Sequence, residues 1–199
     1  KVETVDLTGK SIYPSFIDMY SGFGVKKPQP QSRGSFSPQY DASRKGYYWN
    51  DHVRPETNAF DDFKYDEKAA KELLKAGFGV VNTHKQDAIV RGTGLLVALN
   101  QNGNTASQII DKKSGQYFSF SKSRLSKQSY PGSIMGSMAL LRQVYNDADW
   151  YAKGNIDTKD LALEALIANK DEAQVFEAGN WLNDLRVDKV GDDVGVSYI

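Results

Sequence analysis

The sequence predicts an α/β fold built around a parallel sheet. Helical and strand-like segments alternate through the second half of the 199 residues, which is the pattern of βαβ units. Hydrophobic residues make up 40% of the chain and charged residues 25%, as in globular proteins that bury a core. The chain carries fewer βα units than a closed eight-stranded barrel, which needs about 250 residues, so we expect an open, incomplete sheet.

The first residues predict two strands joined by a turn. KVETVDL alternates like a strand, and Thr8-Gly9-Lys10 leads into SIYPSFIDMY, which is rich in β-branched and aromatic side chains. A helix is expected over residues 66–76, with Asp66 near its start and Gly77 at its C-cap position. FGVVNTH follows this helix as a short apolar strand.

The later elements continue this alternation. Strands are expected at GLLVALN, GQYFSFS and AQVFEAG, and helices from Pro131 to Gly154, from Leu161 to Asn169 and from Trp181 to Asp193. The last residues, VGVSYI, are expected to form a final apolar strand. Because such a strand needs neighbours on both sides to be buried, we expect that the chain is a fragment of a polypeptide that continues beyond Ile199.

The stretch from about residue 20 to 65 interrupts the alternation. It is rich in Pro, Gly, Ser and aromatic residues and shows no sustained period, so it predicts a functional or interface loop rather than a linker. Tyr47, Tyr48 and Trp49 could form a stacking platform for a sugar or a peptide. Alternatively, these aromatic side chains pin the loop to the body of the domain.

Composition excludes several classes of function. Lys plus Arg and Asp plus Glu number 25 each, so no net charge attracts nucleic acid or an anionic membrane. The absence of cysteine excludes disulfides, thiolate metal sites and thiol nucleophiles. No apolar run approaches the roughly 20 residues of a membrane span. A start at Lys1 fits a processed N-terminus, and hence a periplasmic or secreted location, as well as a cytoplasmic one.

Charge is nevertheless uneven along the chain. Residues 101–130 carry five basic side chains against the single acid Asp111, whereas the last sixty residues are acidic. This segregation would suit contacts with the remainder of the polypeptide or with a partner protein, and it would equally suit a solvated basic face.

The segment VDLTGKSIYPSFIDMYSGFG resembles the entry into the barrel of the amidohydrolase superfamily, the imidazolonepropionase-like metal-dependent hydrolases. The matching positions are Asp6, Gly9, Lys10, Pro14, Phe16, Ile17 and Asp18, whereas Ser15 stands where the family usually has Gly. KELLKAGFGVVNTH resembles the first barrel helix and the second strand. The resemblance implies that residues 1–10 end a small β-sandwich domain. Residues 11–199 then form the N-terminal part of a TIM barrel of the (β/α)8 type, with a loop insertion at about 20–65.

The resemblance also implies where a metal site would lie. Active members of the family end the first strand in His-x-His, two imidazoles that bind zinc or another divalent metal. Here the corresponding residues are Tyr20-Ser21-Gly22. Gly22 has no donor atom, and a neutral phenol with a pKa near 10 is a poor ligand, so we expect a degenerate site with no metal in this chain.

Two further residues are candidates for residual chemistry. His84 follows a strand and would face the active-site side of a barrel, and Glu177 in VFEAG could be a surviving carboxylate ligand. Alternatively, His84 is a hydrogen-bonded structural histidine and Glu177 is a plain polar residue at the end of a strand. Arg91-Gly92-Thr93-Gly94 fails as a dinucleotide-binding turn, because Val97 replaces the third glycine and a strand follows it.

Three hypotheses follow. The chain is a non-catalytic, pseudo-enzyme part of an amidohydrolase-like barrel, completed by the remainder of its own polypeptide. Alternatively, the parent hydrolyses C–N, amide or cyclic amide bonds with a metal-activated water, and the catalytic residues lie outside this sequence. The third hypothesis is a glycan- or peptide-binding module that uses Tyr47, Tyr48 and Trp49.

Overall fold

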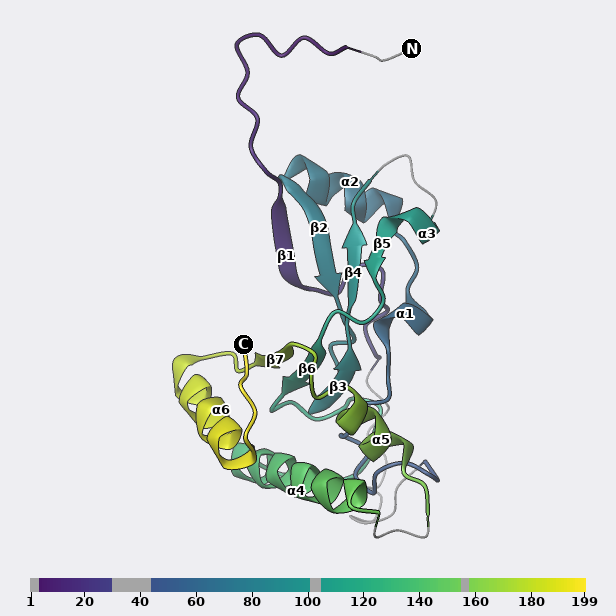
Figure 1. Ribbon diagram of the computed structural model, residues 1–199, viewed down its shortest axis with the longest axis vertical. Helices are drawn as coiled ribbons and strands as arrows, with labels where there is room; N and C mark the ends of the chain where they lie inside the picture. Colours follow the sequence, from purple (N-terminus) through teal and green to yellow (C-terminus); the bar gives the residue numbers. More distant parts are fainter. Residues whose placement is uncertain (1–3, 30–43, 101–104, 155–157) are drawn as a thin grey trace.

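The computed structural model describes residues 4–29, 44–100, 105–154 and 158–199, and it shows a mixed α/β fold with two small sheets (Figure 1). The first sheet has the order β1-β2-β4-β5. Its strands are β1 (Phe16–Ser21), β2 (Phe78–Thr83), β4 (Leu95–Ala98) and β5 (Ile109–Asp111). The second sheet has the order β3-β6-β7, with β3 (Val90–Thr93), β6 (Gln116–Ser119) and β7 (Gln174–Glu177).

The expected single parallel sheet is wrong in part. Only the β1–β2 and β6–β7 pairs of the named strands are parallel, whereas β2–β4, β4–β5 and β3–β6 are antiparallel. The reason is a long hairpin over residues 90–119, in which β3 runs into β4 through Gly94 and the chain returns as β5 and β6. The two arms of a hairpin run in opposite directions, so the strands that pair across it are antiparallel. The described residues therefore form no closed barrel.

Both chain ends also differ from the prediction. Residues 4–15 form no strand, and the Asp6 carboxylate accepts hydrogen bonds from the backbone and hydroxyl of Thr8 at a local turn. The C-terminal residues form a bridge rather than a strand. Tyr198 forms an isolated parallel β-bridge with Gln174, and the backbone N–H of Ile199 donates to the Gln174 carbonyl at 2.8 Å.

The predicted helices are confirmed. They are α2 (Glu67–Lys75), α4 (Ile134–Ala152), α5 (Leu161–Ala168) and α6 (Trp181–Val194), and the structure adds the short α1 (Ala59–Asp62) and α3 (Thr105–Gln108). Each long helix begins at a side chain that accepts a hydrogen bond from its first turn. These N-caps are Asp66, Ser133, Asp160 and Asn180.

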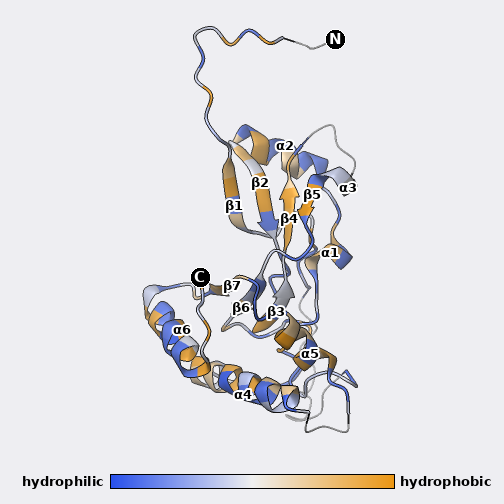
Figure 2. Cartoon of the chain, in the orientation of Figure 1, coloured by the Kyte–Doolittle hydropathy of each residue, from blue (hydrophilic) through white to orange (hydrophobic). Residues whose placement is uncertain are grey.

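Two hydrophobic cores lie beside the two sheets. The larger packs α4, α5 and α6 against the second sheet, with Phe118, Leu141 and Val190 buried in it. The smaller lies between α2 and the first sheet, whose strands carry hydrophobic residues along much of their length (Figure 2). Within the described residues, no helix is long and apolar enough to cross a membrane.

Candidate functional site

The ends of three strands bring together Tyr20, His84 and Glu177 around the side chain of Arg91. The Arg91 guanidinium donates from Nη1 to the Tyr20 hydroxyl at 2.9 Å and pairs through Nη2 with Glu177 Oε2 at 2.5 Å. Nη1 also lies 3.4 Å from Nε2 of His84, and Nε donates to the Ala88 carbonyl at 3.2 Å. The Arg91 side chain is 3% exposed, whereas that of Glu177 is 41% exposed. We call these four side chains, Tyr20, His84, Arg91 and Glu177, the Arg91 cluster.

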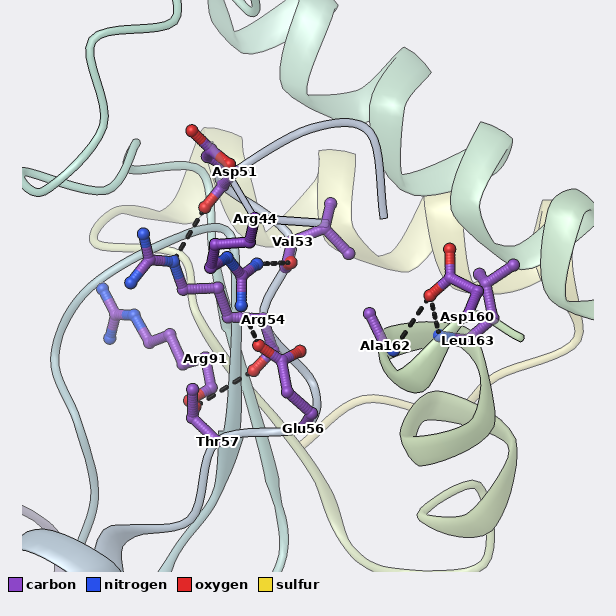
Figure 3. A network of polar contacts seen from close by, with 10 residues as sticks. All are labelled: Arg44, Asp51, Val53, Arg54, Glu56, Thr57, Arg91, Asp160, Ala162 and Leu163. Carbon is purple, nitrogen blue, oxygen red and sulfur yellow. Dashed lines mark hydrogen bonds and ion pairs between the residues drawn. The ribbon is translucent and has the colours of Figure 1, made fainter. Parts of the chain in front are cut away.

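Strand pairing and one strained turn position these groups. Because β1 and β2 are parallel, their carboxyl ends lie at one edge, where the His84 N–H donates to the Ser21 carbonyl at 3.1 Å. The turn after β2 places Ala88 at φ 87°, in the left-handed region, and β3 then carries Arg91 back toward His84. The Thr57 hydroxyl donates to the Arg91 carbonyl at 2.7 Å, and this contact anchors the backbone of Arg91 (Figure 3).

His84 is held as a neutral imidazole. Its ring stacks on Tyr117 with centroids 3.8 Å apart and meets the edge of Tyr20 at 4.7 Å. Burial is the main cause that lowers the pKa of His84 to about 3, and the charge of Arg91 lowers it further. Because a guanidinium only donates, Nε2 of His84 accepts and the ring proton lies on Nδ1. Nδ1 is buried without a hydrogen-bond partner among the described residues.

Tyr20 is held as a neutral phenol. Burial raises the pKa of Tyr20 to about 12, and the hydrogen bond to Glu177 adds to this shift, whereas Arg91 opposes it. The hydroxyl therefore accepts from Arg91 and donates to the Glu177 carboxylate. The phenol, the guanidinium and the carboxylate form a closed set of contacts in which the two formal charges cancel.

The residues of this cluster do not fit a divalent metal. Its potential ligands are a neutral phenol, an imidazole nitrogen that faces a guanidinium and a carboxylate in an ion pair. The guanidinium would repel a second cation at this position. Throughout the part of the chain that the structure describes, no group of three His, Cys, Asp or Glu side chains is placed to hold a metal ion.

No protein-family model and no curated protein matches this chain. The structure is similar to the crystal structure of an amidohydrolase from Thermotoga maritima MSB8, with a TM-score of 0.72 and 21% sequence identity. The chain shares its fold with an amidohydrolase. The match covers 98% of this chain and 53% of that one, so the chain spans about half the length of this structural neighbour.

The aromatic residues of the loop lie apart from the Arg91 cluster, beside α4. Tyr48 is 2% exposed and donates its hydroxyl to Asp147 at 2.6 Å, so its ring offers no free face to a ligand. Trp49 is half-buried and stacks on Tyr130 with centroids 6.1 Å apart. Tyr47 is also half-buried, and Arg44 lies 4.6 Å above its ring.

Two loops hold this region on the body of the domain. The Arg44 guanidinium pairs with Glu56 and donates to the Val53 carbonyl, and Asp160 caps α5 beside them (Figure 3). His52 is buried between the same loop and residues 121–130, with Nδ1 accepting from the Ser123 N–H at 3.0 Å.

Sequence reasoning missed Arg91 and Tyr117 as members of a site. A signal for Arg91 was present, because it lies within AIVRGTGLLVAL, where its neighbours are apolar or small. An arginine in a buried strand needs a partner, and the Glu177 carboxylate at the end of β7, two strands away in the same sheet, supplies it.

Proposed function

We propose that this chain is a non-catalytic part of an amidohydrolase-like protein, with the Arg91 cluster standing where the fold family places its metal. The single observation that carries this proposal is the buried Arg91 guanidinium between Tyr20, His84 and Glu177. Tyr20 and Gly22 are also the positions at which the sequence resemblance expects the two metal-binding histidines.

The chemistry of the cluster supports a scaffold role. Hydrolysis by the family depends on a cation that binds a water molecule and lowers its pKa. A guanidinium has five N–H donors and stays protonated at all relevant pH values. It has no open coordination position at which a water molecule could bind as it does to a metal ion. His84 and Glu177 already contact this guanidinium, so neither is free to act as a general base. Hydrolysis of an amide or related C–N bond by the parent would therefore use residues outside this chain.

Exposed apolar surface supports a partner for this scaffold. β1 is an edge strand, and Phe16, Ile17 and Met19 on it are between 54% and 67% exposed. At the N-terminal end of α6, Trp181 and Leu185 are 69% and 60% exposed. We propose that the rest of an amidohydrolase-like polypeptide covers these surfaces. The division into residues 1–10 of a small β domain and a barrel part from residue 11 belongs to the same proposal.

Metal content tests this proposal. The chain is purified without chelator, and its metal content is measured by elemental mass spectrometry. We expect no zinc, manganese or iron above background that depends on this chain. Near-stoichiometric metal that Glu177→Gln or His84→Phe removes would contradict the scaffold role.

A second candidate function is ligand binding beside α4. A cavity of about 530 Å³ is lined by Tyr47, Trp49, Trp150, Asp147 and Asp160, among others, and Trp150 is 51% exposed. Aromatic side chains with carboxylates suit a glycan or a peptide. Titration of tryptophan fluorescence with hexasaccharides, for the wild type and for Trp150→Ala, tests this role. Saturable quenching that the substitution removes would support it, and no quenching would exclude it for these sugars.

A further inference from the structure

We infer that Arg91 is the resident cation of this site and that its charge alone suffices to exclude a divalent metal. The inference deepens the proposed function and rests on it. The loss of two histidines at positions 20 and 22 removes ligands, but it does not explain why a cation of the protein itself now lies among the remaining groups.

The contacts of Arg91 carry the first step. Its guanidinium reaches Tyr20 at the end of β1, His84 after β2 and Glu177 at the end of β7, so one side chain joins groups from both sheets. Each of these three contacts uses an N–H that faces an acceptor: a hydroxyl, an imidazole nitrogen or a carboxylate. These are the acceptor types that also bind metals, and the guanidinium occupies them all.

The charge balance carries the second step. Tyr20 and His84 are neutral groups, and Glu177 supplies one negative charge against the one positive charge of Arg91. A divalent cation added beside the buried guanidinium would meet repulsion in a medium that screens charge poorly. Removal of the guanidinium charge would leave one carboxylate and one imidazole available as ligands.

Space carries the third step. A Cβ atom built on Gly22 would lie 3.7 Å from the side chain of Gln86, an ordinary contact, and Gly22 does not adopt the left-handed backbone conformation. A residue with a Cβ atom can therefore be introduced at position 22 without backbone strain. Histidines can be returned to positions 20 and 22 while Arg91 is kept or removed, which separates the two explanations.

The experiment compares zinc binding by variants of the 199-residue chain that keep or remove the charge of Arg91. The variants are the wild type, Y20H/G22H, and Y20H/G22H/R91L, each titrated with zinc against a fluorescent chelator after circular dichroism has checked the fold. We expect one zinc per chain in the triple variant, bound at least 100-fold more tightly than in Y20H/G22H. Y20H/G22H/R54L is the matched control, because Arg54 is a second partly buried arginine that donates to the Asp51 carbonyl. It should bind zinc no better than Y20H/G22H.

Two results would overturn the inference. Zinc bound equally well by Y20H/G22H and by the triple variant would show that the histidines alone decide. A folded triple variant that binds no zinc would show that Arg91 is not what excludes the metal. Zinc bound to the wild type would contradict the proposed function as well as the inference, whereas the two results above leave the wild type without zinc, so the failures are distinguishable.

A second measurement tests the inference even if the triple variant does not fold. Arg91→Leu, Glu177→Gln and the double variant form a cycle in the wild-type background, read by urea unfolding. We expect the Arg91–Glu177 interaction to change the unfolding equilibrium constant at least tenfold beyond additivity. Additive effects would show that Arg91 has no charge partner in the cluster and would overturn its role as the resident cation.

Discussion

The molecule buries two histidines in two polar clusters, and the two clusters differ in how completely they are paired. His52 has a partner on each ring nitrogen, because Nδ1 accepts from the Ser123 N–H at 3.0 Å and Nε2 lies 3.4 Å from the Gln128 carbonyl. His84 has Arg91 at Nε2 and no partner at Nδ1 among the described residues. Both rings are about 1% exposed, so burial alone does not separate them.

The two histidines therefore differ in how much of their surroundings loop packing explains. The contacts of His52 join two loops, so its geometry is explained by loop packing alone. The Arg91 cluster instead carries a buried charge and an acceptor set at strand ends, and Glu177 and Tyr20 reach the solvent. A fold that needed only packing would place apolar side chains there, since a buried ion pair contributes little net stability.

The largest expected effect comes from removing the carboxylate of the Arg91 cluster. Glu177→Ala would leave a guanidinium that is 3% exposed without its charge partner, and we expect a loss of about 3 kcal/mol in the free energy of unfolding. Arg91→Leu should cost less, about 1 kcal/mol, because Glu177 is already 41% exposed and can return to water. Urea unfolding of both variants measures the order. A larger loss for Arg91→Leu would show that packing, not charge, dominates this cluster.

The comparison between the histidines predicts unequal costs for the same substitution. His52→Phe would leave the buried Ser123 N–H without its acceptor, and we expect a loss of about 2 kcal/mol. His84→Phe keeps the stack on Tyr117 and removes both the Nδ1 donor that has no partner and the Nε2 acceptor of the long 3.4 Å contact with Arg91, so its cost should be smaller, about 1 kcal/mol. Chemical denaturation checks both values. Equal losses would mean that His84 has a partner that balances Nδ1.

Acid should weaken the folded state through both histidines. Burial is the first cause that lowers the pKa of His52 to about 4 and of His84 to about 3, from an ordinary value of 6.5. The unfolded chain takes up these protons below about pH 6.5, whereas the folded chain does not, so stability is full above that pH and falls as the pH drops toward 4 and then 3. At pH 5 each histidine should cost about 2 kcal/mol relative to pH 7.

Urea unfolding of the wild type and of His84→Phe at pH 7 and pH 5 measures how much of this loss of stability comes from His84. The variant should recover about half of the loss that the two histidines cause together. If the variant and the wild type lose the same stability between pH 7 and pH 5, His84 is not a buried neutral ring.

The helices were predictable from the sequence because their signals are local. Asp66 caps α2, Ser133 caps α4, and each signal lies within a few residues of the helix that it begins. Strand direction was not predictable in the same way, since β3 and β6 carry no local mark of antiparallel pairing. Their orientation follows from the hairpin that joins them, which depends on contacts distant in the sequence.

The candidate site was predictable in its parts but not in its centre. Motif resemblance placed Tyr20 and Gly22 at the end of a strand, and strand order placed His84 and Glu177 at strand ends. Arg91 has no linear motif that marks it as part of a site, because nothing local shows that its side chain meets groups that lie 71 and 7 residues away in the sequence. A buried arginine in the sequence raises the question of which group pairs with its charge. Only the three-dimensional structure identifies that group.

The smallest expected effect concerns Gly22, and it tests whether the Arg91 cluster lacks a side chain there for steric reasons. Gly22→Ala should change the free energy of unfolding by less than about 0.5 kcal/mol, because its Cβ would meet only Gln86 at 3.7 Å. Gly94→Ala is the control, since its Cβ would lie 2.6 Å from the ring of Tyr117 and must destabilise the chain. A large loss at Gly22 would mean that packing forbids a side chain at this position. A near-zero change would show that packing permits a side chain at position 22, so that the missing ligands and the charge of Arg91 remain as the two explanations that the zinc titrations separate.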